Sequence, residues 1–285
     1  MGIELQIVLL ISIIVGTSVQ QVFKKAYNRR GGTNVFIFGA LTVATAAIFF
    51  AATASYPMHF SWGLLPHAVG FAAAYLCATV FTMLAINEGS LSLTSLAISF
   101  SLLIPTVAGL IFYGEPLTVW FFIGLGLLLI SLVLINIKGG EIKITLKWGI
   151  YVILAFIGNG ACSAVQTDYS KTHQAGKSEF MIIALSIVFL VLLILSLIKE
   201  RGSIISTVKG NWYFMLLCGV ANGAVNLFVI LLSAHMAASI MFPLISAGGI
   251  VLTSLISIFL YREKLSLSQY IGMVLGIGAI VFLNF

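Results

Sequence analysis

A single apolar stretch decides the fold class: residues 178–198 read SEFMIIALSIVFLVLLILSLI, with one charged side chain, Glu179, near the start. Lysines stand immediately before and after this stretch, at Lys177 and Lys199. A helix that crosses a bilayer needs about 20 mostly apolar residues, because its backbone must satisfy its own hydrogen bonds in hydrocarbon. Residues 178–198 therefore predict a transmembrane helix.

Nine further segments share the length and apolar character of this stretch. The 285 residues are 61% apolar and only 8% charged, with a mean hydropathy of +1.16. So few charged side chains cannot cover the surface of a soluble globule. The composition predicts an all-α membrane protein with ten transmembrane helices. The predicted spans are residues 3–23, 34–54, 66–86, 91–112, 117–137, 148–168, 178–198, 212–232, 239–260 and 265–284.

The connections between the spans exclude several classes of function. The longest hydrophilic connections, residues 138–147 and 199–211, are too short for a separate enzyme or receptor domain. The net charge of +6 is divided among short loops, which argues against a nucleic-acid partner. There is no GxxxxGK[ST] motif, and the three cysteines lack metal-ligand spacing. We therefore expect no ATP site, metal, cofactor or catalytic residue.

Basic residues alternate between the loops. Twelve of the fourteen lysines and arginines lie in loops 1, 3, 5, 7 and 9. Because cytoplasmic loops carry the excess of Lys and Arg, this pattern predicts that the odd-numbered loops are cytoplasmic and that both termini face outward. The first span lacks a basic segment before it and a small-residue cleavage site after it, so we expect it to be retained.

An internal repeat appears at an offset of 148 residues. The motif YGEPL at 113–117 recurs as YREKL at 261–265, and eight of the 24 positions that begin there are identical. Each half then holds five spans, and an odd number makes the second half enter the membrane from the opposite side. Inverted repeats of this kind place a substrate site near the membrane midplane and transport by alternating access. We expect an N-terminal five-helix repeat at 1–137, a linker at 138–147 and a C-terminal five-helix repeat at 148–285.

The end of the chain carries a family resemblance. Residues 249–273, GIVLTSLISIFLYREKLSLSQYIGM, resemble the last two helices of small multidrug resistance transporters. The ten-span duplicated layout is similar to the EamA-type carriers of the drug/metabolite transporter superfamily. The resemblance implies a carrier but no particular substrate, since such carriers move amino acids, cations, sugars, nucleosides or drugs. Small multidrug transporters use a glutamate in their first helix, and residues 13–17 here contain none, so their proton-for-cation exchange is not carried over.

Acidic residues occupy matching positions of the repeat at Glu115 and Glu263, each at the start of a predicted helix. A carboxylate there satisfies free backbone N–H groups and the positive end of the helix dipole. We interpret both as helix caps rather than as substrate ligands.

Charged side chains are almost absent from the span interiors. His67 and Asp168 fall near predicted span ends, where an interfacial role is favoured. Glu88 and His235 also lie near ends and are the candidates for a titrating group. The lack of a central charge favours a neutral or zwitterionic substrate, or a cation held on aromatic faces.

Amide and hydroxyl side chains at mid-depth are the candidate substrate ligands. Asn159 lies in the middle of span six, and Asn222 and Asn226 share one face of span eight. An amide that faces lipid costs free energy, so these side chains should face protein or a wet cavity. Hydrogen bonding between helices is an equally good explanation for the pair in span eight. The other candidates are Gln20 and Gln166, which the repeat relates, and Tyr75, Ser95, Ser99 and Ser101 on the facing wall.

Prolines and glycines mark where the helices could bend. Pro105 and Pro243 interrupt spans four and nine and are candidate hinges, because proline removes a backbone hydrogen bond. Gly158 and Gly160 are expected to loosen span six. Glycines of the last span, which contains a GxxxG pattern, indicate close helix packing instead.

These features together predict a secondary transporter. We expect it to move a small neutral, zwitterionic or cationic organic solute, such as an amino acid, a nucleoside or a drug-like metabolite, by alternating access. The alternatives are a flippase for a lipid-linked substrate and a non-transporting membrane scaffold. The expected partners are the small-molecule substrate and membrane lipid, with the protein as a monomer or homodimer. The expected location is a cell membrane, namely a bacterial inner or plasma membrane.

Overall fold

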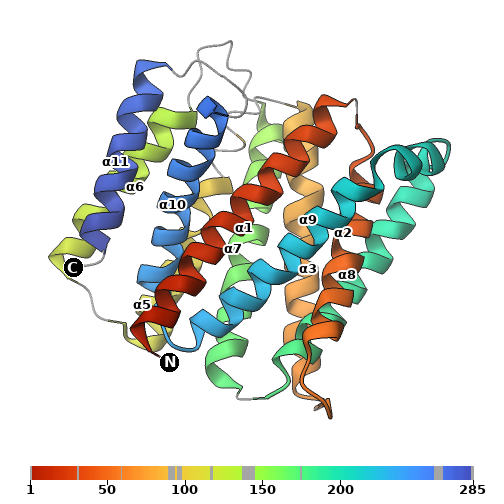
Figure 1. Cartoon of the computed structure of the whole chain (residues 1–285), viewed down its shortest axis with the longest axis horizontal. Coiled ribbons are helices and arrows are strands. Elements are labelled where there is room, and N and C mark those ends of the chain that lie inside the picture. The colour runs from red at the N-terminus through yellow and green to blue at the C-terminus, as the bar shows by residue number, and fades with distance from the viewer. Residues whose placement is uncertain are drawn as a thin grey trace. The chain divides into compact units, whose positions relative to one another are not determined.

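The computed structural model describes residues 2–30, 32–58, 60–88, 94, 98–115, 118–136, 145–173, 175–259 and 266–283. Within these ranges every regular element is a helix (Figure 1). The helices are α1 (Ile3–Arg29), α2 (Val35–Thr53), α3 (Leu64–Glu88), α5 (Leu103–Tyr113), α6 (Val119–Asn136), α7 (Leu146–Thr172), α8 (Lys177–Lys199), α9 (Ile204–Ser233), α10 (Ala238–Phe259) and α11 (Leu267–Leu283).

Each predicted span coincides with one of these helices. Six of the described helices, α1, α2, α3, α7, α8 and α9, are long and apolar enough to cross a bilayer, and the other four are shorter apolar helices. The chain is therefore an all-helical, multi-pass membrane protein. Within span four, predicted at 91–112, the described residues are helical at 94, at 98–100 and in α5, with a turn at Ser101 and Leu102.

The chain divides into two compact units that are interleaved in sequence. Unit 1 comprises Met1–Ala73 and Asp168–Ala234, and unit 2 comprises Ala74–Thr167 and His235–Phe285. Each unit therefore takes helices from both predicted repeats. The two units are defined by contacts within the fold, whereas the repeats were predicted from similarity between two parts of the sequence. The repeat boundaries at 137 and 148 therefore stay a prediction.

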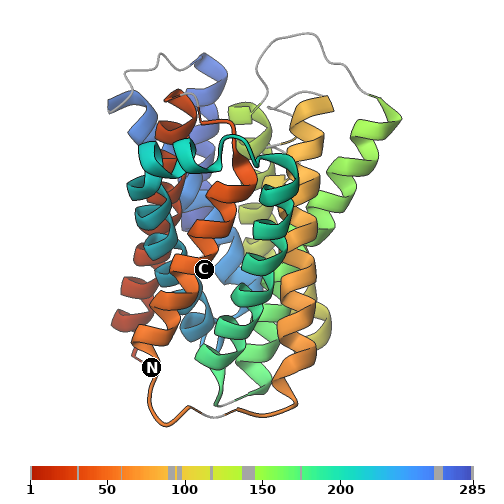
Figure 2. The same cartoon turned by 90° about the vertical axis from the view of Figure 1, so that its right-hand side faces the viewer.

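Unit 1 is built around α2 and α9. Helix α2 packs against both α8 and α9, and α1 packs against α9 (Figures 1 and 2). Glycines allow the close approach of α9, because a Cβ at Gly219 would lie 2.6 Å from the carbonyl oxygen of Thr42. A buried cluster fills one part of this unit, formed by Tyr27, Phe38, Phe214, Met215 and Cys218.

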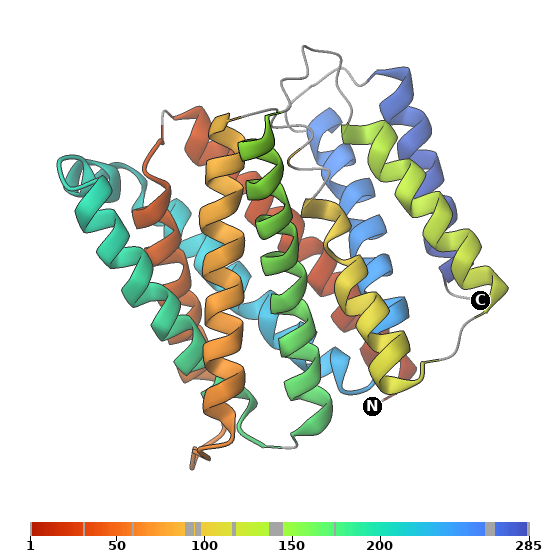
Figure 3. The same ribbon diagram turned by 180° about the vertical axis from the view of Figure 1, so that it is seen from behind.

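Unit 2 contains two helix pairs, α6 with α11 and α5 with α10 (Figure 3). Ser131 of α6 donates a hydrogen bond to the carbonyl oxygen of Gly272 in α11 at 2.6 Å. Gly276, one turn further along α11, also faces Ser131. The GxxxG pattern thus serves close helix packing, as predicted. The buried core of these helices includes Leu128, Leu132, Ala247 and Ala279.

Among the described residues, each unit has a carboxylate that caps the N-terminus of another helix. In unit 2, Glu115 accepts hydrogen bonds from the N–H groups of Ala238 and Ser239 at 2.8 and 2.7 Å. In unit 1, Glu200 accepts from Phe36 and Ile37, both at 2.9 Å. The prediction that Glu115 caps a helix is confirmed, but the helix is α10 and not the one that follows Glu115 in sequence. Glu263 lies outside the described residues.

Candidate functional site

Unit 2 contains an interrupted helix. The chain is helical at residues 98–100, turns at Ser101 and Leu102, and continues as α5. At the turn, Ser101 N–H donates to the carbonyl oxygen of Ile98 and Ile104 N–H donates to that of Ser101, both at 3.0 Å. Pro105 explains the break, because it has no N–H and its ring would clash with the carbonyl of residue 101 in a continuous helix. The interruption predicted at Pro105 is present, and its role as a hinge stays a prediction.

Helix α7 supplies an amide to this break. Asn159 Nδ2 donates to Ser101 Oγ at 2.7 Å, and Ser101 Oγ donates to the carbonyl oxygen of Ile98 at 2.6 Å. Gly160 permits the approach, since a Cβ there would lie 2.7 Å from the carbonyl oxygen of Ser101. Gly158 is equally close to the backbone of α3. Close packing, rather than the expected loosening of the helix, accounts for both glycines.

A pocket lies beside the break. The enclosed space at its centre is small, about 10 Å³, and the open depression around it brings the total to about 230 Å³. The lining is mostly apolar, with hydroxyl groups from Ser99, Thr106 and Ser246. Binding sites for small molecules combine an apolar concave wall with a few polar groups, so this pocket is the candidate substrate site. Its lining residues are Ser99, Phe100, Leu102, Leu103, Thr106, Leu125, Leu128, Leu129, Leu132, Pro243 and Ser246.

Pro243 reaches the same pocket from α10. The prediction that it interrupts span nine is wrong, because α10 remains helical on both sides of it and through it. Proline in a helix interior still removes one backbone hydrogen bond, here the bond to the carbonyl of Ser239. Pro243, which lacks one backbone hydrogen bond, and Leu102, which lies in the turn before α5, therefore line one pocket.

A second polar cluster lies in unit 1, where α1 meets α9. Asn222 Nδ2 donates to Gln20 Oε1 at 3.1 Å. Asn226 Nδ2 donates to the backbone oxygen of Asn222 at 2.8 Å and to its Oδ1 at 3.2 Å. Gln20 is buried, with 7% of its surface exposed. The structure thus brings together three predicted ligands in a chain of amide hydrogen bonds between two uninterrupted helices.

The remaining predicted residues are distributed over both units. Tyr75 of α3 is half-buried, and Gln166 of α7 is buried with 4% exposed. Ser95 lies outside the described residues. Glu88, at the end of α3, forms an ion pair with Lys147 at the start of α7. His235 is exposed in the turn between α9 and α10. Both candidate titrating groups therefore lie at helix ends.

The sequence prediction missed two hydroxyl groups of the pocket. Thr106 directly follows Pro105, and its Oγ1 donates to the carbonyl oxygen of Leu102 at 2.8 Å. Ser246 lies three residues after Pro243. A serine or threonine within one turn of a proline in an apolar span could have indicated both residues. Serine and threonine satisfy backbone groups that proline leaves free.

Comparison with known proteins adds a family and a fold. Residues 146–285 match the model of the EamA-like transporter family, which confirms the resemblance seen in the sequence. No curated protein matches the chain. A solved crystal structure of a protein is similar over 99% of this chain and 96% of that chain, with a TM-score of 0.78 and 14% sequence identity. At this identity the likeness shows a shared fold.

Proposed function

From the match of residues 146–285 to the EamA-like transporter family, we propose that the chain belongs to this family and is a secondary transporter working by alternating access. The family is one of transporters, and the chain is a multi-pass membrane protein. The proposal adds the mechanism, the kind of solute and the residues that bind it. A bacterial inner or plasma membrane is the proposed location, with the protein as a monomer or homodimer and lipid around its spans.

The interrupted helix beside a pocket carries this proposal. At membrane depth, irregular backbone is tolerated only where it is buried in protein or lines a cavity. Substrate sites of secondary transporters are typically built on discontinuous helices, whose freed backbone groups can bind the solute. The turn at Ser101, the amide of Asn159 and the pocket lined by Pro243 supply these features within one unit.

The lining of the pocket indicates the kind of solute. Among its lining residues, leucine side chains predominate, and the polar groups are uncharged hydroxyls. Phe100 adds an aromatic face, which can hold a cation without a carboxylate. We therefore favour a small neutral, zwitterionic or cationic organic solute, such as an amino acid, a nucleoside or a drug-like metabolite.

The remaining predicted ligands are part of the proposal. Asn159 and Ser99 are assigned to the pocket of unit 2. In unit 1, the amides of Gln20, which is buried, and of Asn222 and Asn226, which are half-buried, offer further donors and acceptors. The substrate-binding assignment also retains Tyr75, Ser95 and Gln166.

Reconstitution in liposomes tests the proposal. The purified protein should show saturable uptake of at least one amino acid, nucleoside or organic cation, with or without an ion gradient. Asn159→Ala should lower that uptake about tenfold, equivalent to about 1.4 kcal/mol of lost stabilisation. Ile153→Ala, at a position on α7 that is 59% exposed, is the matched control and should leave uptake unchanged. Absence of saturable flux for every solute class would refute the transporter.

The chain of amide bonds in unit 1 favours one alternative, a membrane scaffold. Amides that serve only to join α1 and α9 would bond with one another, as Gln20, Asn222 and Asn226 do. A scaffold requires that cysteines placed at positions 159, 222 and 226 resist water-soluble thiol reagents, whereas a transporter requires at least one of them to react. A flippase instead predicts copurifying lipid, which mass spectrometry of the same sample detects.

A further inference from the structure

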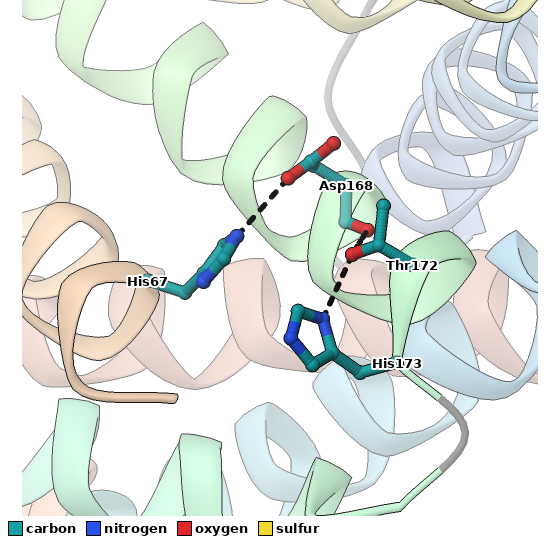
Figure 4. A network of polar contacts seen from close by, with 4 residues as sticks. All are labelled: His67, Asp168, Thr172 and His173. Atoms are coloured by element: carbon teal, nitrogen blue, oxygen red, sulfur yellow. Dashed lines mark hydrogen bonds and ion pairs between the residues drawn. The ribbon is translucent and has the colours of Figure 1, made fainter. Parts of the chain in front are cut away.

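A cluster of polar and aromatic side chains at one end of unit 1 lies outside the candidate site. His67, near the start of α3, faces Asp168, near the end of α7 (Figure 4). The distance between His67 Nε2 and Asp168 Oδ2 is 3.1 Å. The side chains are 26% and 47% exposed, respectively, so water can reach the pair.

Aromatic rings fix the position of His67. The ring centroids of Tyr169 and His173 lie 5.3 and 5.2 Å from that of His67, both edge-on. Tyr169 is itself stacked between His173 and Phe180, with 4.4 Å between centroids on each side. Its hydroxyl donates to the backbone oxygen of Gly176 at 3.1 Å. His67, on α3, therefore lies beside a stack of three rings.

Two helices, α7 and α8, bring titratable groups to the surroundings of His67. On α7 and directly after it are Asp168, Tyr169 and His173. Helix α8, which packs on the stack through Phe180, brings Glu179, a buried side chain that interacts electrostatically with Tyr169. Helix α3 adds no other ionisable residue between positions 64 and 73. The same helix ends also carry Lys171 of α7 and Lys177 of α8, so they hold two cations as well as two carboxylates and one further imidazole.

The two ring nitrogens of His67 have different environments. Nε2 contacts Asp168, whereas Nδ1 is buried and has no hydrogen-bond partner among the described residues. Buried polar atoms are nearly always hydrogen-bonded, so a histidine that only joined two helices would be expected to use both nitrogens. With Nε2 donating to the carboxylate, Nδ1 carries the lone pair that can bind a proton, and because this atom is buried, proton exchange with water requires a movement that exposes it. Protonation changes the His67–Asp168 pair from negative to neutral.

From this geometry we propose that His67 and Asp168 form a proton-binding site that couples proton movement to solute transport. The inference rests on the proposed transport function and adds the coupling ion. Histidine is the side chain that ordinarily changes its charge between pH 5 and 8. Within transporters, His and Asp residues commonly form proton relays. The predicted orientation places this end of α3 and α7 outside, where the pair meets the external proton concentration.

Proton movement in liposomes tests the coupling. The protein is reconstituted with the pH-sensitive dye pyranine inside, and the amino acid, nucleoside or organic cation with the fastest uptake is added outside. For the wild type, addition of the solute should change the internal pH, and an imposed pH gradient should alter the uptake rate. In His67→Gln, both effects should be lost, while exchange of labelled for unlabelled solute continues. Glutamine keeps a donor for Asp168 but cannot titrate.

Two further variants separate the outcomes. Asp168→Asn should lose proton movement as His67→Gln does, whereas Glu4→Gln, at the exposed start of α1, should keep it. Persistent proton movement in both His67→Gln and Asp168→Asn would overturn the inference, as would its loss in Glu4→Gln alone. A wild type that exchanges solute without any change in internal pH overturns the inference but leaves the transporter intact. A wild type that moves no solute refutes the transporter itself.

Discussion

The polar groups of unit 1 and unit 2 use the same residue type in different backbone settings. In unit 1, Asn222 and Asn226 lie on α9, a helix of 30 residues, and bond with each other and with Gln20. In unit 2, Asn159 bonds with Ser101 at a break in a helix, beside a pocket. Amides in the first setting satisfy one another, whereas the amide in the second supports irregular backbone.

The two backbone settings differ in the hydrogen-bonding groups that they can offer to a solute. A helix without a break has no spare backbone groups in its interior, so the amides of unit 1 offer only their own side chains. At the turn of unit 2, backbone carbonyls and hydroxyls lie together, and Pro243 removes a further N–H on the facing helix. We therefore expect substitutions in unit 2 to affect transport most and those in unit 1 to affect mainly stability.

The largest effect is expected where α7 approaches the break. In Gly160→Ala, the new Cβ would lie 2.4 Å from Ile104 Cδ1 and 2.7 Å from the carbonyl oxygen of Ser101. Overpacking of this kind costs about 3 kcal/mol when backbone must move. Thermal unfolding in detergent should show the loss of stability. Gly149→Ala, on the same helix with no atom within 4 Å, is the control and should gain up to about 1 kcal/mol. Equal behaviour of the two variants would contradict the packing described at the break.

Pro243→Ala should act in the opposite direction on stability. Alanine restores the N–H that α10 lacks at this position and should stabilise the protein by about 2 kcal/mol, less than the roughly 3 kcal/mol of an isolated helix. If Pro243 is a hinge, solute uptake should fall at the same time. Pro66→Ala is the matched control, because Pro66 lies in the first turn of α3, where proline costs nothing. Unchanged uptake rate and solute affinity in Pro243→Ala would rule out the hinge.

The two carboxylate caps should respond alike, because both units use the same device. Glu115→Ala and Glu200→Ala each remove the acceptor of two N–H groups at a helix N-terminus. Each should lower the free energy of unfolding by about 1 kcal/mol. Glutamine at either position keeps one acceptor oxygen and should recover part of the loss, as thermal unfolding can show. A clear loss in one variant and none in the other would mean that the units depend on their caps unequally.

The sequence predicted the helices well because their signal is local. Twenty apolar residues in succession, as at 178–198, permit few structures other than a membrane helix. The break at Ser101 was partly predictable from Pro105, which acts on residues within one turn of it. The continuity of α10 through Pro243 was not, because neighbouring side chains and packing decide whether proline interrupts a helix.

Contacts between distant segments could not be predicted in the same way. His67 and Asp168 lie 101 positions apart, and each alone is an ordinary polar residue at a helix end. Glu115 carried the correct signal for a cap, but its position beside α10 depends on the packing of α5 against α10. Likewise, Thr106 and Ser246 share a pocket only because the fold brings α5 and α10 together.

The smallest expected effect is in the amides of unit 1. Asn222→Ala removes the Nδ2 group that donates to Gln20 and the Oδ1 atom that accepts from Asn226. The free energy of unfolding should fall by about 0.6 kcal/mol, the average for such side-chain hydrogen bonds in membranes. Asn226→Ala should cost less, because the bond between Gln20 and Asn222 remains. If these amides also bind solute, Asn222→Ala will reduce uptake more than Ile194→Ala, a control at a 55% exposed position of α8. If uptake is the same in both variants while stability falls only in Asn222→Ala, the amides join helices, and solute binding belongs to the interrupted helix of unit 2.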